Sequence, residues 1–275
     1  MRDAVSVPSR CCVPITALAP FAIGTFAVTW GIIGFYILFP NQATAWFGAM
    51  SGRHPAFFLA TWAPAIAAFA IVLFYCGWQG VWRFLSRVTL WRCSIWWAAF
   101  LLVGVPLVFA AGALVKGSLF VNPIFAADPS AILAAMTVML FLGPIEEFGW
   151  RGVAQPLLQR HLAPIWAGLL IGVTWGLWHL PAFYLSGTVQ SGWAFTPFFI
   201  GNVSLAVIVT PLFNASRGSI LLPAAFHYQL INPLWPDAQP YDTYLFVAVA
   251  IAVVWLNRTT LFKRVGAATD VAPSR

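Results

Sequence analysis

Charge is scarce in this sequence, and acidic charge is the scarcest. Aspartate and glutamate together number 7, lysine and arginine 14, and charged residues make up 8% of the 275 residues. Hydrophobic residues make up 61% and the mean hydropathy is +0.86, so a soluble domain of this composition would have an unsolvated surface. We therefore predict an all-α, polytopic membrane protein that forms a single transmembrane domain over residues 1–275.

Cysteine is also rare, and its placement excludes two further kinds of structure. The 4 cysteines form no CxxC pair or metal-ligand spacing, and they imply no disulfide framework.

The net charge of +7 would suggest nucleic-acid binding in a soluble protein, but here the basic residues lie between apolar segments, where they set membrane topology. We expect the lipid bilayer as a partner, and no nucleic acid.

Long apolar runs separated by polar links predict about eight membrane spans. The fourth would be roughly 43 Å long at 1.5 Å per residue, and Pro144 is expected to kink it. The predicted spans cover about residues 16–39, 55–78, 93–115, 131–159, 163–185, 195–213, 218–235 and 242–261.

Basic residues are distributed unevenly between the two sides of this predicted bundle. Eight spans place both termini on one side. Of the 14 lysines and arginines, Arg53 and Lys116 fall on the other side and Arg151 falls inside a span. The remaining basic residues are Arg2, Arg10, Arg83, Arg87, Arg92, Arg160, Arg217, Arg258, Lys263, Arg264 and Arg275. This bias predicts a multi-pass protein of the cell membrane with both termini in the cytoplasm.

The chain contains only two glutamates, Glu146 and Glu147, and both lie in the fourth predicted span. A carboxylate at membrane depth costs roughly 2.5–3.5 kcal/mol on insertion scales, so such a residue indicates function. Glu147 and Arg151 are four residues apart on one helical face, which predicts an ion pair. Glu146 lies about 100° further round the helix, has no cation nearby in the sequence, and is expected to face the bundle interior.

Two histidines fall within spans, His179 in the fifth and His227 in the seventh. Counted from the link between their antiparallel spans, Glu146 lies about 21 Å and His179 about 24 Å along its helix. His227 lies about 13 Å into its span, which is within reach if the helices tilt. These depths predict a buried polar site among helices four, five and seven.

A carboxylate and two histidines in a water-accessible pocket can hydrolyse an amide. The carboxylate is suited to take a proton from water, and the histidines to hold that water or stabilise the oxyanion. No serine or cysteine is obviously paired with a base; Ser204 and Ser219 have the character of packing or turn residues. We favour catalysis without a cofactor. Zinc is the alternative, since Glu146, His179 and His227 form a ligand set that leaves a position for water.

Three motifs in this order resemble the CPBP family of intramembrane proteases. This family comprises the CAAX prenyl proteases and the bacteriocin-processing (Abi) proteins, and it includes the Ras-converting enzyme. The resemblance covers about residues 130–235. Its motifs are Glu146-Glu147-x-x-x-Arg151, Trp175-x-x-x-His179, and His227 followed by a nearby asparagine.

The resemblance implies a role for each of these residues. Glu146 and His179 would activate the water that attacks a peptide bond. His227 and Asn232 would stabilise the oxyanion. The supporting residues would be Glu147, Arg151 and Trp175. The substrate would be a peptide or a segment of a membrane protein.

The last motif departs from the family pattern. The family places asparagine or aspartate four residues after the histidine, a position that Ile231 occupies here. Asn232 stands five residues after His227, which rotates it by about 100° on a helix, and it precedes Pro233, which disfavours helical geometry. A local bulge would bring it back; otherwise Gln229 or water would have to substitute.

Two other functions stay open beside a protease. A proton-coupled transporter could use Glu146 and His179 as a relay, although the chain has no internal repeat and a single Pro-kinked helix of the kind that transporters use in pairs. A non-catalytic immunity or scaffold protein of the same family is favoured by the displaced Asn232.

Overall fold

The structure is a computed structural model that describes residues 12–121 and 128–273. Within these ranges the chain forms helices and turns and no β-strand. The predicted all-α fold is therefore confirmed for the described part. Arg2, Arg10 and Arg275, which contribute to the predicted cytoplasmic charge, lie outside it.

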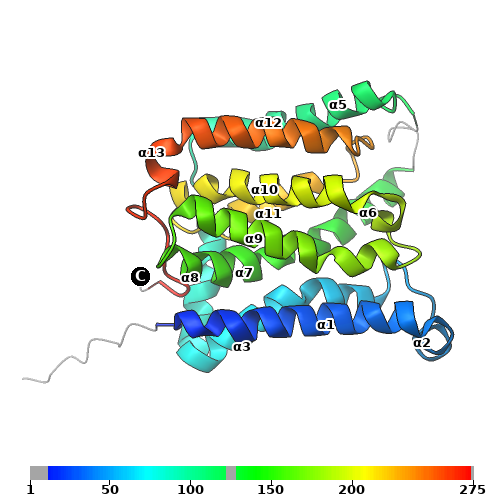
Figure 1. Ribbon diagram of the computed structural model, residues 1–275, viewed down its shortest axis with the longest axis horizontal. Helices are drawn as coiled ribbons and strands as arrows, with labels where there is room; N and C mark the ends of the chain where they lie inside the picture. The colour runs from blue at the N-terminus through cyan, green and yellow to red at the C-terminus, as the bar shows by residue number, and fades with distance from the viewer. Residues whose placement is uncertain (1–11, 122–127, 274–275) are drawn as a thin grey trace, which may run out of the picture.

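The longer helices are arranged in layers (Figure 1). At one face α1 packs on α3; α9, α10 and α11 lie in the middle; α5 and α12 pack on each other at the opposite face. Their bounds are α1 Leu18–Leu38, α3 Pro55–Leu85, α5 Val105–Lys116, α9 Pro164–Trp178, α10 Phe195–Ala215, α11 Leu221–Leu230 and α12 Tyr241–Leu256. Shorter α-helices connect or end them: α2 Pro40–Phe47, α4 Ile95–Ala99 and α13 Arg258–Leu261. Short turns flank them: η1 Ile15–Ala17, η2 Ser86–Thr89, η3 Phe100–Gly104, η7 Leu180–Tyr184 and η8 Val189–Gly192.

Six helical stretches of the described chain are long and apolar enough to cross a membrane. They are Ile15–Leu38, Pro55–Thr89, Ile95–Lys116, Pro129–Gln159, Pro164–Tyr184 and Phe195–Ala215. They coincide with the first six predicted spans, and the chain is a polytopic membrane protein. At the seventh and eighth predicted spans lie α11, with 10 residues, and α12, with 16 residues, both shorter than the roughly 20 residues that a perpendicular crossing needs.

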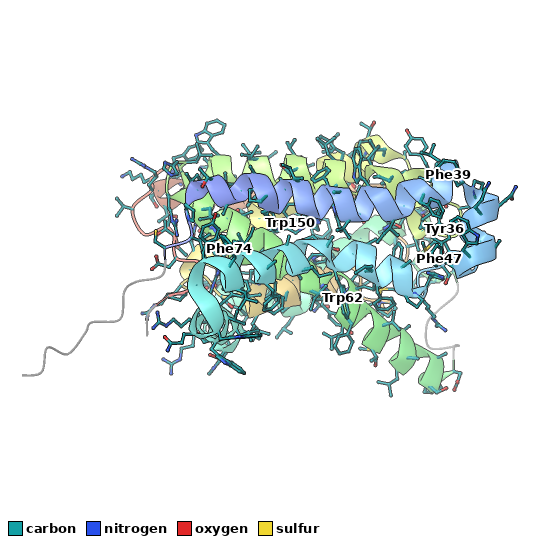
Figure 2. The ribbon with its side chains drawn as sticks, turned by 90° about the horizontal axis from the view of Figure 1, so that it is seen from below. Tyr36, Phe39, Phe47, Trp62, Phe74 and Trp150 are labelled. Atoms are coloured by element: carbon teal, nitrogen blue, oxygen red, sulfur yellow. The ribbon has the colours of Figure 1, made fainter. Side chains whose placement is uncertain are left out.

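The stretch Pro129–Gln159 is interrupted, as Pro144 predicts. Proline cannot donate the helical hydrogen bond, and the helix α6 Pro129–Leu142 ends before it. In Figure 2 the green helix α6 slopes away from α1 and α3. The stretch continues as the 3₁₀ turn η5 Pro144–Glu146, α7 Glu147–Gly149, the π-helical turn η6 Trp150–Ala154 and α8 Gln155–Gln159. Short π-helical turns of this kind occur frequently at functional sites.

A network of aromatic rings and hydroxyls fixes this irregular stretch against α1 and α9. Trp150, between α1 and α3 in Figure 2, packs edge-on against Phe21 at 5.6 Å and Trp178 at 6.1 Å between ring centroids. The Trp178 indole donates to Thr29 Oγ1 at 2.9 Å, and Thr29 donates to the Ala60 carbonyl at 2.7 Å. The contacts hold the segments that carry the glutamates and His179 in a fixed relation.

Arg87 has a different role from the one its position in the sequence suggests. The sequence places it in a predicted cytoplasmic link, but its side chain is buried. Its guanidinium donates to four main-chain carbonyls: Gly152 at 2.6 Å, Gly218 at 2.7 Å, Arg151 at 2.9 Å and Val271 at 3.1 Å. Arg87 is thus a cross-link between three distant segments.

Both ends of the described chain lie at the same end of the bundle (Figure 1). Arg160, at the end of α8, donates to the carbonyls of Val13 and Thr269. The C-terminal segment is held there by further bonds, from Arg87 to Val271 and from Gln159 to Ala268.

Candidate active site

Glu147 is the centre of a buried ionic group. Its Oε2 lies 3.4 Å from Arg151 Nη1, which is the ion pair that the sequence predicts. Its Oε1 lies 2.9 Å from Nδ1 of His227, a contact that the sequence does not reveal. A carboxylate accepts hydrogen bonds, so Nδ1 of His227 carries a proton in this contact. Glu147 therefore orients the His227 ring as well as pairing with Arg151.

Gly143 provides the space that His227 occupies. A Cβ at this position would lie 2.5 Å from His227 Nε2 and 2.7 Å from Ile231 Cδ1. Real Cβ atoms do not show distances this short, so a larger residue at position 143 would force the side chains of His227 and Ile231 to move. The Gly143-Pro144 pair both interrupts the fourth span and lets the imidazole reach Glu147.

Glu146 is buried like its neighbour but has different partners. Its side chain is 3% exposed, and Oε2 accepts a hydrogen bond of 2.8 Å from Nε1 of Trp175. No ion pair involves Glu146 in the described part of the chain. Glu146 thus faces the interior without a cation, as the sequence predicts.

Trp175 connects the members of this cluster. Its main-chain carbonyl lies 2.8 Å from His179 Nδ1. Since a carbonyl can only accept, His179 Nδ1 is the donor and Nε2 of a neutral ring keeps its lone pair. The Trp175 ring lies edge-on to His179 at 5.6 Å and to His227 at 5.2 Å, and Arg151 Cζ lies 5.5 Å from its centroid. The sequence suggests Trp175 only as a supporting residue.

A cavity of about 430 Å³ borders this cluster. Its lining includes Trp175, His179, His227 and Asn232, whereas Glu146, which accepts from the Trp175 indole, is not part of the lining. The cavity is within the size range of small-molecule pockets and can hold a short peptide segment.

Asn232 lies beyond the end of α11, which stops at Leu230. No bulge therefore returns it to the helical face of His227. Its Nδ2 donates to Gln229 Oε1 at 3.1 Å, and its Oδ1 accepts from the Leu234 N–H at 3.0 Å. The amide still reaches the cavity wall, but by way of a turn.

The alternative metal set does not assemble in this geometry. Among the described residues, no three His, Cys, Asp or Glu side chains are grouped closely enough to hold a metal ion. Nδ1 of His179 and Nδ1 of His227 are both engaged by protein oxygens, which leaves Nε2 of each ring as the atom that could meet a metal. The set Glu146, His179 and His227 fails as a zinc site in this geometry because its three side chains are not grouped, not because its ring nitrogens are occupied.

Comparison with known proteins places this cluster in context. A family model described as Type II CAAX prenyl endopeptidase Rce1-like matches residues 128–230. The matched residues include Glu146, His179 and His227, and they end before Asn232. The CAAX prenyl protease 2 of Methanococcus maripaludis is 29% identical over 141 residues, which are 47% of this chain and 52% of that protein. The match thus spans about half the length of this curated relative.

Proposed function

Because this chain belongs to the CPBP family of CAAX-type proteases, we propose that it is an intramembrane endopeptidase in which Glu146 and His179 activate the attacking water. One observation carries the proposal. Trp175, a residue of the cavity wall, donates from its indole N–H to Glu146 Oε2 and accepts from His179 Nδ1 at its carbonyl. One residue of the wall therefore contacts both a carboxylate without an ion pair and an imidazole that also lines the cavity.

The proposed reaction begins when water enters from the cavity past Trp175. Glu146 takes one proton from this water, and Nε2 of His179 accepts a hydrogen bond from its remaining hydrogen. The hydroxide attacks the peptide carbonyl carbon. Glu146 then gives the proton to the departing nitrogen, which leaves as an amine while the new carboxyl group keeps the water oxygen.

We assign the stabilisation of the oxyanion to the side chains of His227 and Asn232. For His227 to donate from Nε2 it must carry both ring protons, and Glu147 is the carboxylate that such an imidazolium pairs with. Asn232 Nδ2 has two hydrogens, and the bond to Gln229 uses one of them. The other is available to a carbonyl oxygen in the cavity. Preorganised donors of this kind contribute strongly to acyl transfer.

We propose that no metal takes part, since the three candidate ligands do not fit one together. We also propose that the protein lies in the cell membrane with both termini in the cytoplasm. The proposal rests on the excess of basic residues in the two tails and in the links that follow the second, fourth and sixth predicted spans. The substrate is proposed to be a peptide or a membrane-protein segment.

A non-catalytic member of the same family is the second candidate. The observation that favours it is the position of Glu146 outside the cavity lining. A scaffold would keep Glu146 closed off from the cavity, whereas an enzyme must admit water to it. The cleavage experiment described next distinguishes an enzyme from a scaffold.

The test is cleavage by the full chain, purified and reconstituted in nanodiscs, of a library of membrane-associated peptides, with new termini read by mass spectrometry. We expect the wild type to cleave and Glu146→Gln and His179→Ala to lose about 10²–10⁴-fold in rate, with unchanged thermal unfolding. His161→Ala, in the link between the fourth and fifth spans, is the matched control and should cleave normally. Cleavage should survive strong chelators. Full activity of Glu146→Gln would reject the mechanism, and loss on chelation would restore the metal alternative.

A further inference from the structure

One part of the cavity wall carries polar groups that the proposed mechanism does not use. It includes Asn202 from α10 and Asp242 from the first turn of α12, together with the neighbours Asp237 and Gln239. This wall and the wall of His179 and His227 enclose the same space. A peptide bound for cleavage would therefore contact both.

Asp242 is a buried carboxylate that forms no ion pair among the described residues. It is 5% exposed, and its oxygens accept only from the Thr243 N–H at 2.8 Å and from Gln239 Nε2 at 3.3 Å among the described residues. Two neutral donors compensate a buried carboxylate only in part, and a cation would do so far better.

Asn202 is a second unsatisfied group on this wall. Its side chain is 4% exposed, and its Nδ2 has no hydrogen-bond partner among the described residues. A buried amide without an acceptor is costly in an apolar surrounding, so such groups call for an explanation. A carbonyl oxygen entering the cavity would satisfy it.

Asp237 shows what a compensated carboxylate in the same cavity looks like. It pairs with Lys116 at 2.7 Å, and its side chain is 62% exposed. The two aspartates carry the same charge, but only Asp237 forms an ion pair with Lys116 and is exposed to solvent. The carboxylate that lacks an ion pair is therefore Asp242 in particular, and the aspartates of the cavity do not all share this property.

We propose that this wall is a substrate subsite that binds a basic side chain of the peptide. The lysine or arginine charge pairs with Asp242, and a main-chain carbonyl of the same peptide accepts from Asn202 Nδ2. The subsite rests on the proposed endopeptidase function and adds a specificity to it, a preference for substrates with a basic residue near the scissile bond.

The experiment measures binding separately from cleavage. Fluorescent membrane-anchored peptides that differ at one residue (lysine, norleucine or glutamate) are titrated against the reconstituted full chain carrying Glu146→Gln, and are also offered to the wild type for cleavage. We expect the lysine peptide to bind at least about tenfold more tightly than the norleucine peptide, and the glutamate peptide to bind most weakly. In Asp242→Asn this order should collapse to near equality.

Two matched variants sharpen the result. Asp237→Asn removes the same charge from the same cavity, and it should leave the lysine preference within about twofold. Asn202→Ala should weaken lysine and norleucine peptides by the same factor, up to about tenfold, because it loses the carbonyl contact only.

Each outcome decides one of the two proposals. Equal affinity of the three peptides for the Glu146→Gln chain overturns the subsite even if Asp242→Asn does not fold. An equal loss of preference in Asp237→Asn and Asp242→Asn also overturns it, because the effect is then general charge. Cleavage of all three peptides at one rate removes the subsite and leaves the protease. Binding with the lysine preference but no cleavage keeps the subsite and rejects catalysis.

Discussion

The two buried arginines, Arg87 and Arg151, show how differently one side chain can be used within one bundle. Arg87 directs its guanidinium to main-chain carbonyls, with four bonds between 2.6 and 3.1 Å. Arg151 approaches one carboxylate at 3.4 Å and the face of Trp175, and its Nε and Nη1 have no hydrogen bond in the described part of the chain.

Arg87 thus belongs to the framework of the fold, whereas Arg151 belongs to the candidate active site. A buried cation that directs four of its five N–H donors to carbonyls is costly to disturb and has little capacity left for a ligand. A buried cation with unused donors beside a carboxylate and an imidazole retains that capacity. Several buried groups of the cavity and its cluster have a polar atom without a hydrogen bond among the described residues, namely Glu147, Arg151, Asn202 and Trp235, and Thr25 and Gln155 are further examples outside the cavity lining.

The largest effect is expected from Arg87→Met. The methionine fills the volume but leaves four carbonyls without their donor, and each unsatisfied buried group costs about 1–3 kcal/mol in the free energy of unfolding. Denaturant unfolding in detergent, followed by tryptophan fluorescence, measures it. Arg258→Met is the control, because Arg258 is exposed and its guanidinium donates to the Trp255 carbonyl, three residues earlier in the chain. This control should change stability by less than about 0.5 kcal/mol.

Arg151→Met should cost less stability and more activity. Glu147 keeps its bond to His227 in this variant, so we expect a loss of about 1–3 kcal/mol in unfolding free energy. Peptide cleavage should fall by about 10²-fold, since His227 and Trp175 lose their positioning. The double variant Glu147→Gln/Arg151→Met removes both charges and should recover part of the stability but none of the cleavage. If Arg151→Met is as destabilising as Arg87→Met and still cleaves, the distinction between the two arginines is wrong.

Gly143→Ala probes the site through its backbone. The added methyl group would displace the His227 ring, so we expect about 1–3 kcal/mol of destabilisation and a clear loss of cleavage. Gly34→Ala is the matched control, because nothing lies within 4 Å of its Cβ position in α1 among the described residues. It should be neutral or stabilising by up to about 1 kcal/mol, as alanine favours helix. Equal behaviour of the two variants would show that the close approach of His227 is not needed.

Much of the fold follows from local patterns. Apolar runs of about 20 residues locate the six long spans, and Pro144 locates the interruption in the fourth. The Glu147–Arg151 pair follows from a spacing of four residues. These features depend on residues that are close in sequence, so the sequence alone predicts them.

The features that the sequence does not reveal all depend on distant segments. Arg87 meets carbonyls 131 and 184 residues away, and an arginine in a short link gives no sign of such partners. His227 meets Glu147 across 80 residues, at a position that a larger residue at 143 would force it to leave. Asp242 differs from Asp237 only in burial and in Lys116, neither of which a sequence pattern encodes.

The smallest effect is expected where the C-terminal segment is held by neutral groups. Gln159 exchanges two bonds of 2.9 Å with Asn214 and donates to the Ala268 carbonyl at 2.8 Å. Gln159→Leu should cost about 1 kcal/mol in global unfolding, since neutral hydrogen bonds contribute little net free energy, while Arg87 still holds Val271. Limited proteolysis should nevertheless release residues 264–273 faster. We expect Gln159→Leu to cost less stability than Arg87→Met, because Gln159 holds the last segment through neutral hydrogen bonds and Arg87 links the bundle through a charged group. Equal losses of unfolding free energy from the two variants would contradict this order.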